Sequence, residues 1–218
     1  MKHPAGDGRE LLVRTLHVGP MTACCYLIGG SDGAGGTIID PGDEADRITE
    51  AVEATGIAVK QIILTHGHAD HIAALEEVRN AFPKAEVMIH ADDAPMLERP
   101  SLNLSLFLGQ SINCTPADRL LHDTEVVELG GLEANVIHVP GHTPGGVCLH
   151  VPDAAIVFTG DVLFAGGIGR TDFPGGSEAA LLAGIRDKLL RLPPETTVYP
   201  GHGPSSTIAH EKLSNPFL

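Results

Sequence analysis

The stretch Leu64–Leu75, LTHGHADHIAAL, places three histidines and one aspartate within six residues. The apolar run VKQIILTH before it predicts a strand, and HIAALEEVRNAF after it predicts a helix. In a turn between the two, side chains at positions i and i+2 can project to the same side, so His66 and His68 could bind one cation. Asp70 and His71, at the helix start, could face a second one. Desolvating so many polar groups together needs a compensating partner, and a metal ion supplies it.

The rest of the chain alternates short β-rich runs with helical patterns. This order predicts an α/β fold of two mixed sheets, each covered outside by helices, in one domain spanning residues 1–218. The shared edge where the strands end is a natural place for polar groups. The predicted strands are Leu11–Val18, Ala23–Gly30, Gly36–Gly42, Val59–His66, Ala85–His90, Thr124–Gly130, Leu132–Pro140, Gly145–Pro152, Ala154–Gly160 and Thr196–Gly201. The predicted helices are Asp43–Gly56, His71–Phe82, a short one within Asp92–Glu98, Ser177–Leu192 (with Ser177 as its N-cap) and Ser205–Leu213.

The bulk composition narrows the class of protein. Hydrophobic residues make up 43% of the 218 residues and aromatic residues only 4%, which predicts a core that is mostly aliphatic. A net charge of −14 disfavours binding to nucleic acid or to an anionic membrane. No apolar run approaches the ~18 residues of a membrane span. The polar N-terminal residues carry no signal-peptide pattern, so we expect a cytoplasmic protein.

The four cysteines are scattered and form no CxxC pair. This arrangement disfavours a disulfide framework or a structural zinc site. We expect small, buried, reduced side chains. The four are Cys24, Cys25, Cys114 and Cys148.

A zinc-like site needs ligands from beyond one loop. Three further candidates each follow an apolar run: His142 in VIHVPGHTPGG, Asp161 in IVFTGDVLF and His202 in TVYPGHGP. Glycine beside each of them lets the backbone come close to the site. Asp40, in TIIDPG, also stands at a predicted strand end. It is either a surface turn residue or a support for a ligand histidine.

In order and spacing, the motifs THGHADH, PGHTPG, TGD and PGHGP resemble those of the metallo-β-lactamase superfamily, over nearly the whole chain. The resemblance implies an αβ/βα sandwich. It also implies a role for Asp40 in supporting a ligand histidine. The implied ligands are His66, His68 and His142 for a first metal, Asp70, His71 and His202 for a second, and Asp161 bridging both.

Five histidines and two aspartates are nitrogen and oxygen donors, which suit Zn²⁺ first, and also Fe²⁺ or Mn²⁺. Two such cations about 4 Å apart can hold a bridging hydroxide, because metals lower the pKa of bound water towards ~7. The cations outweigh the aspartates and the hydroxide in charge. The centre should therefore attract a small anionic substrate and stabilise an oxyanion after hydroxide attacks a carbonyl. Asp70 could orient the hydroxide or carry a proton.

The loop FAGGIGRTDFPGG, Phe164–Gly176, looks like that of the glyoxalase II branch, and most like its short single-domain hydrolases. This resemblance implies hydrolysis of thioesters such as S-acyl-glutathione. In that branch a Lys and a Tyr of this loop contact glutathione. Here Arg170 could replace the Lys and bind a carboxylate bidentately, or could pair with Asp172, and no Tyr is present.

Other readings stay open. The motif GRTDF also occurs in the related persulfide dioxygenases, which use one iron and O₂, although the closing turn PGHGP favours hydrolysis. A third reading is a metal-binding or redox protein without hydrolase activity. Hydrolysis of β-lactams is not expected, because Asp161 stands where lactam hydrolases of this fold usually have Cys.

Two regions outside the motifs also leave alternatives. The apolar segment Ser101–Ile112 could line the pocket or form a subunit contact, and the chain could be a monomer or a small homo-oligomer. The histidines outside the motifs are expected to be structural or at the surface. Among them, His90 ends a strand and could come near the pocket.

Overall fold

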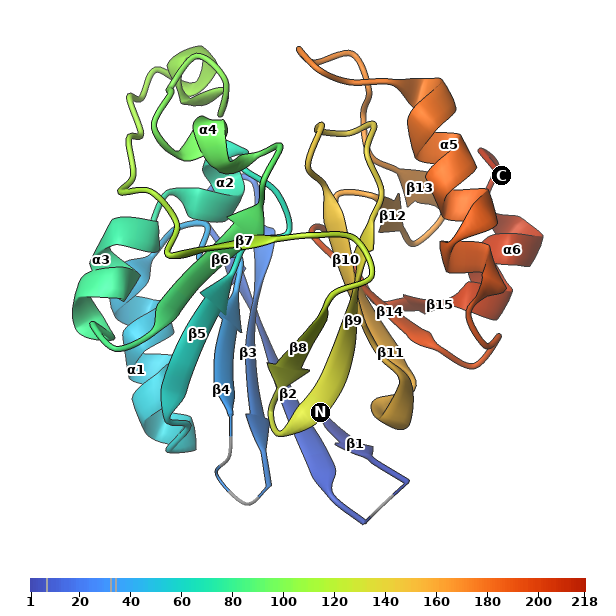
Figure 1. Ribbon diagram of the computed structural model, residues 1–218, viewed down its shortest axis with the longest axis horizontal. Coiled ribbons are helices and arrows are strands. Elements are labelled where there is room, and N and C mark those ends of the chain that lie inside the picture. The colour runs from blue at the N-terminus through green and yellow to red at the C-terminus, as the bar shows by residue number, and fades with distance from the viewer. Residues whose placement is uncertain (7, 32, 34) are drawn as a thin grey trace.

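Two β-sheets pack face to face with helices on both outer sides (Figure 1). The computed structural model describes residues 1–6, 8–31, 33 and 35–218. In this part of the chain the first sheet has seven strands in the order β1 to β7, and the second has six in the order β15-β14-β11-β10-β9-β8. The two mixed sheets predicted from the sequence are thus confirmed. The first sheet comprises β1 Lys2–Pro4, β2 Glu10–Val18, β3 Ala23–Gly30, β4 Gly36–Ile39, β5 Val59–Ile63, β6 Glu86–His90 and β7 Arg119–Leu121.

The second sheet and a small hairpin complete the β-structure. The second sheet comprises β8 Val126–Leu129, β9 Leu132–His138, β10 Val147–Val151, β11 Ile156–Gly160, β14 Thr197–Pro200 and β15 Ser206–Thr207. The hairpin pairs β12 Leu163–Phe164 with β13 Gly167–Ile168. Pairing is parallel between β4 and β5, β5 and β6, β6 and β7, and β11 and β14, and antiparallel elsewhere. Both sheets are therefore mixed.

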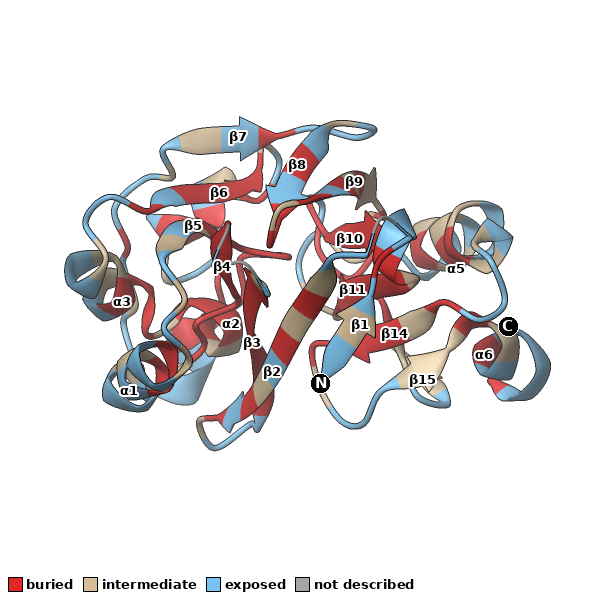
Figure 2. Cartoon of the chain, turned by 90° about the horizontal axis from the view of Figure 1, so that it is seen from below, coloured by how far each residue is buried: buried red, intermediate tan, exposed pale blue. Residues whose placement is uncertain are grey.

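The core has three layers of buried side chains. The largest lies between the sheets, where the rings of Tyr26, Phe158 and Tyr199 pack with centroids 5.0 to 5.6 Å apart among aliphatic residues. A second layer joins the first sheet to α1 and α3, and a third joins the second sheet to α5 and α6. Buried residues accordingly gather on the strands and on the inner sides of the helices (Figure 2). Aliphatic side chains supply most of this core, as the composition predicted.

The α-helices follow the predicted order with two differences. The α-helices are α1 Ala45–Thr55, α2 Ala69–Ile72, α3 Leu75–Ala81, α4 Ala94–Leu97, α5 Glu178–Asp187 and α6 Ile208–Ser214, and the 3-10 helices are η1 Ser105–Leu108, η2 Pro152–Ala154 and η3 Leu189–Arg191. The predicted N-cap is confirmed, because the Ser177 hydroxyl accepts a hydrogen bond from the backbone N–H of Ala180.

The prediction of one continuous helix over 71–82 is wrong. The backbone N–H of Ala74 donates to the Pro41 carbonyl, at 3.0 Å, instead of to a carbonyl one turn earlier. This bond to another segment divides the helix into α2 and α3. The prediction for 177–192 is wrong at its end, where α5 gives way to the tighter turn η3.

The predicted polar groups gather at one edge, where strands of both sheets end. Asp40 follows β4, Asp161 follows β11 and His202 lies two residues after β14. Ligand sites in sheets with parallel strands typically lie outside the carboxyl ends of those strands. Backbone hydrogen bonds also join the two sheets here, from Val147 N–H to the Thr65 carbonyl at 2.9 Å and from Cys24 N–H to the Gly201 carbonyl at 2.7 Å.

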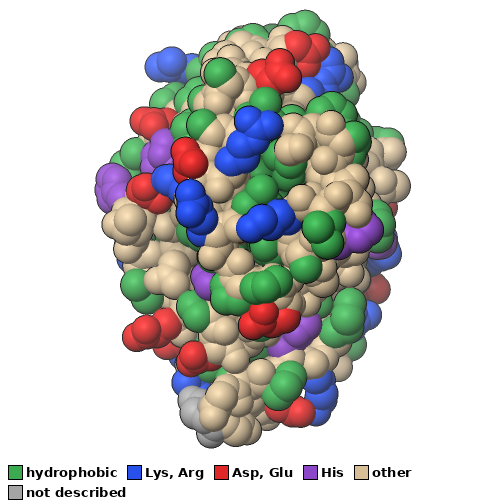
Figure 3. Space-filling model, turned by 90° about the vertical axis from the view of Figure 1, so that its right-hand side faces the viewer, with side chains coloured by type: hydrophobic (Ala, Val, Ile, Leu, Met, Phe, Trp, Pro, Cys, Tyr) green, Lys and Arg blue, Asp and Glu red, His purple; other side chains and the backbone are tan. Residues whose placement is uncertain are grey.

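The surface and the cysteines agree with the composition. All four cysteines are buried and free. The face that carries α5 and α6 mixes basic, acidic and apolar side chains, so the acidic side chains form no continuous patch there (Figure 3). Among the described residues, no helix has the length and apolarity that crossing a membrane requires.

Candidate metal centre

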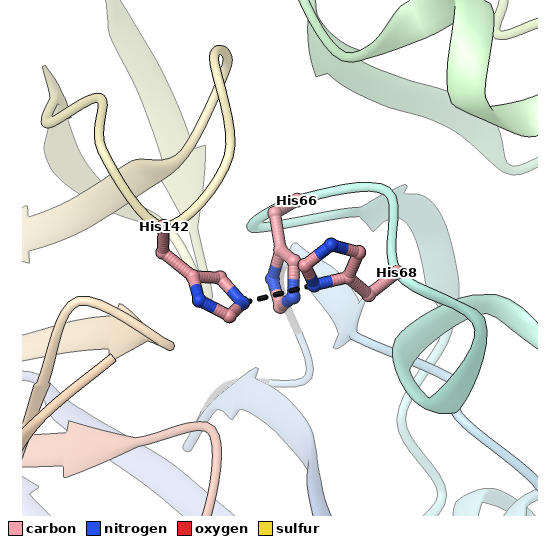
Figure 4. A group of neighbouring side chains, drawn as sticks. All are labelled: His66, His68 and His142. Atoms are coloured by element: carbon pink, nitrogen blue, oxygen red, sulfur yellow. Dashed lines mark hydrogen bonds between the residues drawn. The ribbon is translucent and has the colours of Figure 1, made fainter. Parts of the chain in front are cut away.

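Three buried histidines form the first group of the site (Figure 4). His66 and His68 come from the turn between β5 and α2, and His142 comes from the turn between β9 and β10. His68 Nδ1 and His142 Nε2 face each other at 2.9 Å. The Nδ1–H of His142 donates to the Arg170 carbonyl at 2.8 Å, which leaves the Nε2 lone pair directed into the site.

The His66 ring has an unpartnered nitrogen that fits a cation in this group. Its buried Nε2 has no hydrogen-bond partner, and its Nδ1 lies 3.1 Å from the Thr65 hydroxyl. That hydroxyl gives its own proton to Asp40 at 2.6 Å, so it accepts from His66 Nδ1–H, and Nε2 is left with a lone pair. Burial and the neighbouring histidines hold the pKa of His66 well below its usual range, and burial lowers the pKa of His68 to about 3. Both rings are therefore neutral at pH 7, as metal binding requires.

The second group consists of Asp70, His71 and His202. His202 Nε2 lies 3.1 Å from Asp70 Oδ2 and 3.3 Å from His71 Nε2. Burial alone would lower the pKa of His71, but the carboxylates of Asp161 and Asp70 outweigh it and raise that pKa well above its usual range. Burial likewise opposes the ionised form of Asp70, but His71 and His202 lower its pKa. An Asp70 that stays ionised suits a ligand, or an acceptor for water, better than a proton donor.

Asp161 stands between the two groups. One carboxylate oxygen lies 3.4 Å from His71 Nε2, and the other lies 3.5 Å from His142 Nε2 and 3.6 Å from His202 Nε2. The first of these oxygens is buried without a hydrogen-bond partner. An anionic oxygen in that state favours a cation beside it. The structure therefore brings all seven predicted ligands into one cluster, and their binding of metal stays a prediction.

Asp40 supports the cluster from behind. It accepts hydrogen bonds from His71 Nδ1 at 3.0 Å, from the Thr65 hydroxyl, and from the Thr65 backbone N–H at 2.7 Å. Its backbone φ of 51° is in the left-handed region, which is uncommon for a residue with a side chain. Such strain is typically retained at functional sites. The contact to His71 agrees with the supporting role that the sequence predicted.

We expect the Asp40→Asn variant to bind Zn²⁺ about 10- to 100-fold more weakly than the wild type, the usual effect of removing the partner of a ligand histidine. Asparagine tolerates the left-handed backbone, but its NH₂ group must face one of the three donors that the carboxylate accepts. Competition with a chromophoric chelator measures the affinity. Asp46→Asn, on the exposed side of α1, is the control. Equal affinity in Asp40→Asn and wild type would contradict the supporting role.

Asp93 is a residue of the site that the sequence did not indicate. Its buried carboxylate accepts from the backbone N–H of Gly67 at 3.1 Å and of Gly145 at 2.6 Å. It therefore ties the turn that carries His66 and His68 to the turn that carries His142. Burial raises the pKa of Asp93, and the two backbone donors act against that rise.

A cavity of about 380 Å³ opens on the cluster. Apolar side chains form one part of its lining, here called its wall, and the candidate metal ligands His68, Asp70, His142, Asp161 and His202 form another part, here called its floor. Residues of the segment Ser101–Ile112 contribute to the wall, which supports the first of the two roles considered for that segment. The apolar wall residues are Met21, Leu104, Phe107, Leu108, Phe164, Ile168 and Phe173.

Arg170 lies at this cavity but is already paired. Its guanidinium donates to both carboxylate oxygens of Asp172, at 2.9 and 2.7 Å, and lies 4.2 Å from the centre of the Phe173 ring. The side chains of Arg170 and Asp172 are both about two-thirds exposed. The structure thus contains the Arg170–Asp172 pair, and recognition of a substrate carboxylate by Arg170 stays a prediction.

Comparison with known proteins agrees with this geometry. The family model described as "Metallo-beta-lactamase superfamily" matches residues 18–202. The chain belongs to the metallo-β-lactamase superfamily. Within the superfamily, it is 41% identical over 206 residues to a probable metallo-hydrolase, YqgX, of Bacillus subtilis, with 94% of this chain and 96% of that protein covered. It is 38% identical over 203 residues to hydroxyacylglutathione hydrolase GloC of Haemophilus influenzae, with 91% and 95% covered.

Solved structures of the superfamily superpose closely. The BLEG-1 B3 metallo-β-lactamase has a TM-score of 0.91 at 39% identity, covering 95% of this chain and 99% of its own. TTHA1623, crystallised in a di-iron-bound form, has a TM-score of 0.84 at 38% identity, with 94% of this chain and 100% of that chain covered. ETHE1 from Myxococcus xanthus has a TM-score of 0.76 at 30% identity, with 94% of this chain and 83% of that chain covered. The predicted fold class is therefore confirmed, and the clusters of histidine and aspartate are of the kind that holds divalent metal.

Proposed function

We propose that this metallo-hydrolase cleaves thioesters that have an apolar arm. The observation that carries the proposal is the apolar cavity that opens directly onto the histidine and aspartate cluster. The likeness to hydroxyacylglutathione hydrolase GloC supports thioesters as the substrate class. In the reaction, a water oxygen bonds to the thioester carbonyl carbon and the C–S bond breaks, giving a carboxylic acid and a thiol.

The two groups of ligands would hold one divalent ion each, with Asp161 between them. Such ions supply a Lewis acid for the carbonyl oxygen and a water of lowered pKa. The residues of the chain do the rest. The apolar wall binds the substrate arm and excludes water, and Asp70, at the cavity floor, can accept a hydrogen bond from the attacking water. The likeness to the di-iron-bound TTHA1623 supports two metals and leaves iron beside zinc as a candidate.

A panel of thioesters with acyl chains of increasing length tests this proposal. Because burial of one CH₂ group is worth ~0.8 kcal/mol, we expect kcat/KM to rise about fourfold for each CH₂ that enters the cavity. Phe107→Ala should reduce that increment, since Phe107 lines the cavity. Leu106→Ala is the matched control, because Leu106 is exposed on the same turn and is not among the residues that line the cavity. Hydrolysis of no thioester in the metal-loaded wild type would refute the proposal.

S-lactoylglutathione belongs in the same panel, because it tests the glutathione arm. Arg170 lines the cavity, but its guanidinium already donates to both carboxylate oxygens of Asp172, so a substrate carboxylate would have to compete with that pair. We therefore expect the apolar thioesters to be the better substrates. A clear preference for S-lactoylglutathione that is lost in Arg170→Ala would instead support the role of Arg170 in carboxylate binding.

Two other activities have support from a specific likeness. The structural similarity to ETHE1 favours the persulfide dioxygenase alternative, which predicts O₂ uptake with glutathione persulfide and one iron per chain. The similarity to a B3 metallo-β-lactamase weakens the expectation against lactams that was based on Asp161. A β-lactam substrate and an oxygen electrode assay with glutathione persulfide therefore complete the panel.

A further inference from the structure

A second group of histidines lies apart from the metal centre. His90 ends β6, His138 ends β9, and His122 follows β7. The rings of His90 and His138 stack with centroids 4.0 Å apart, and the ring of His122 lies 6.4 Å from that of His90. None of these three histidines is among the residues found to line the cavity at the metal centre. The proposed hydrolysis therefore gives this group no role.

The donor atoms of this group are close enough to share an ion. One ring nitrogen from each of His90 and His138 and one carboxylate oxygen of Asp92 lie within 4.8 Å of one another. Around a tetrahedral zinc ion with bonds of about 2.0–2.2 Å, neighbouring ligand atoms stand roughly 3.3 Å apart. The stacked rings differ in plane by only 16°, so the His90 ring must turn to direct a lone pair at a shared ion. That turn also releases His90 Nδ1 from the Asp92 backbone N–H, which donates to it at 3.3 Å. The torsion about the bond between Cβ and an aromatic ring has broad energy minima, so the torsion itself opposes such a turn only weakly.

The hydrogen bonds of His138 prepare it as a ligand. Its Nε2 lies 2.8 Å from the Pro144 carbonyl, and because a carbonyl only accepts, Nε2 carries the proton and Nδ1 keeps a lone pair. Ligand histidines usually donate their other N–H to such a carbonyl. His142 in the metal centre makes the same kind of bond, to the Arg170 carbonyl. Burial and the adjacent His138 lower the pKa of His90, so the His90 ring is neutral at pH 7.

The charges around the group also favour a cation. Asp92 is more than half exposed, and its Oδ2 lies 3.8 Å from His90 Nδ1. The Lys188 ammonium, which donates to the His138 carbonyl at 2.7 Å, also donates to Asp123 at 2.8 Å, so its charge is compensated. Two imidazoles and a carboxylate suit Zn²⁺ and similar borderline transition ions.

We propose that His90, Asp92 and His138 form a separate binding site for a divalent transition cation such as Zn²⁺, with His122 as a nearby third imidazole. An ion there would join the end of β6 in the first sheet to the end of β9 in the second. It would also brace the turn that carries Asp93, which holds the two ligand turns of the metal centre through Gly67 and Gly145. This site does not depend on thioester hydrolysis.

Equilibrium dialysis against low-micromolar free Zn²⁺, followed by elemental analysis, tests the site. The wild type is expected to hold about one Zn²⁺ per chain more than either His138→Gln or Asp92→Ala. Both positions are partly or fully exposed, so the variants should fold. His210→Gln, an exposed histidine on α6, is the matched control and should keep the wild-type count.

A second measurement separates binding from damage to the fold. Under the same free Zn²⁺, the thermal midpoint of the wild type should exceed those of the two variants, and this difference should become smaller after chelation of metal. Equal Zn²⁺ counts in wild type, His138→Gln and Asp92→Ala would overturn the proposal. A loss in His138→Gln alone would overturn it too, because that result would trace to the hydrogen bond with Pro144 and not to a shared ion.

Discussion

Asp161→Asn is expected to lose about 10³-fold or more in kcat while the chain stays folded. Among the residues that the structure describes, Asp161 is the one carboxylate within 3.6 Å of nitrogen atoms from both groups of ligands, and one of its oxygens is buried without a hydrogen-bond partner. Asparagine keeps the shape and removes the charge that would hold two cations together. Metal ions contribute several kcal/mol of transition-state stabilisation, and each 1.36 kcal/mol is tenfold in rate, which gives the expected loss.

Two measurements on this variant separate chemistry from folding. Elemental analysis should find at least one metal fewer per chain than in the wild type, and circular dichroism should find the same secondary structure. Asp153→Asn changes an exposed aspartate in η2, and it should leave both metal content and kcat at the wild-type values. Wild-type metal content together with wild-type kcat in Asp161→Asn would remove Asp161 from the metal centre.

The seven clustered residues could be predicted because each lies in or directly beside a turn that follows an apolar run. Such a pattern is local: a strand, a glycine and a metal-capable side chain within a few residues. The fold then brings the strand ends to one edge, where His142 meets His68 although 74 positions separate them. Local patterns also predicted most strands, because their alternation and turn residues are contained within each segment.

The features that the sequence could not predict depend on contacts between segments that are far apart in the chain. The Asp93 carboxylate accepts hydrogen bonds from the backbone N–H groups of Gly67 and Gly145, and nothing in the sequence around Asp93 indicates either partner. The break between α2 and α3 depends on a bond to Pro41, outside the helical pattern. The stacking of His90 on His138 likewise needs the two sheets to pack. Sequence patterns of single segments cannot report such pairings.

The Gly201→Ala variant is expected to lose metal and about 100-fold or more in activity, although Gly201 offers no ligand atom. A Cβ at this position would lie 2.1 Å from Asp161 Oδ1 and 2.9 Å from His71 Cε1. The backbone cannot move away easily, because Gly201 N–H donates to the Gly160 carbonyl and the Gly201 carbonyl accepts from Cys24 N–H, both at 2.7 Å. The carboxylate must therefore shift, and a misplacement of 1 Å can cost 10²-fold in rate.

Gly203→Ala, in the same PGHGP turn, is the matched control. Its Cβ would meet nothing within 4 Å, but its φ of +80° is costly for alanine. We therefore expect Gly203→Ala to lose roughly 1–2 kcal/mol of stability and to keep its metal. Thermal unfolding measures the stability of both variants, and elemental analysis measures their metal content. Only Gly201→Ala should contain less metal than the wild type at a temperature where both variants are folded. Wild-type metal content and rate in Gly201→Ala would contradict the idea that close packing of this turn positions the Asp161 carboxylate.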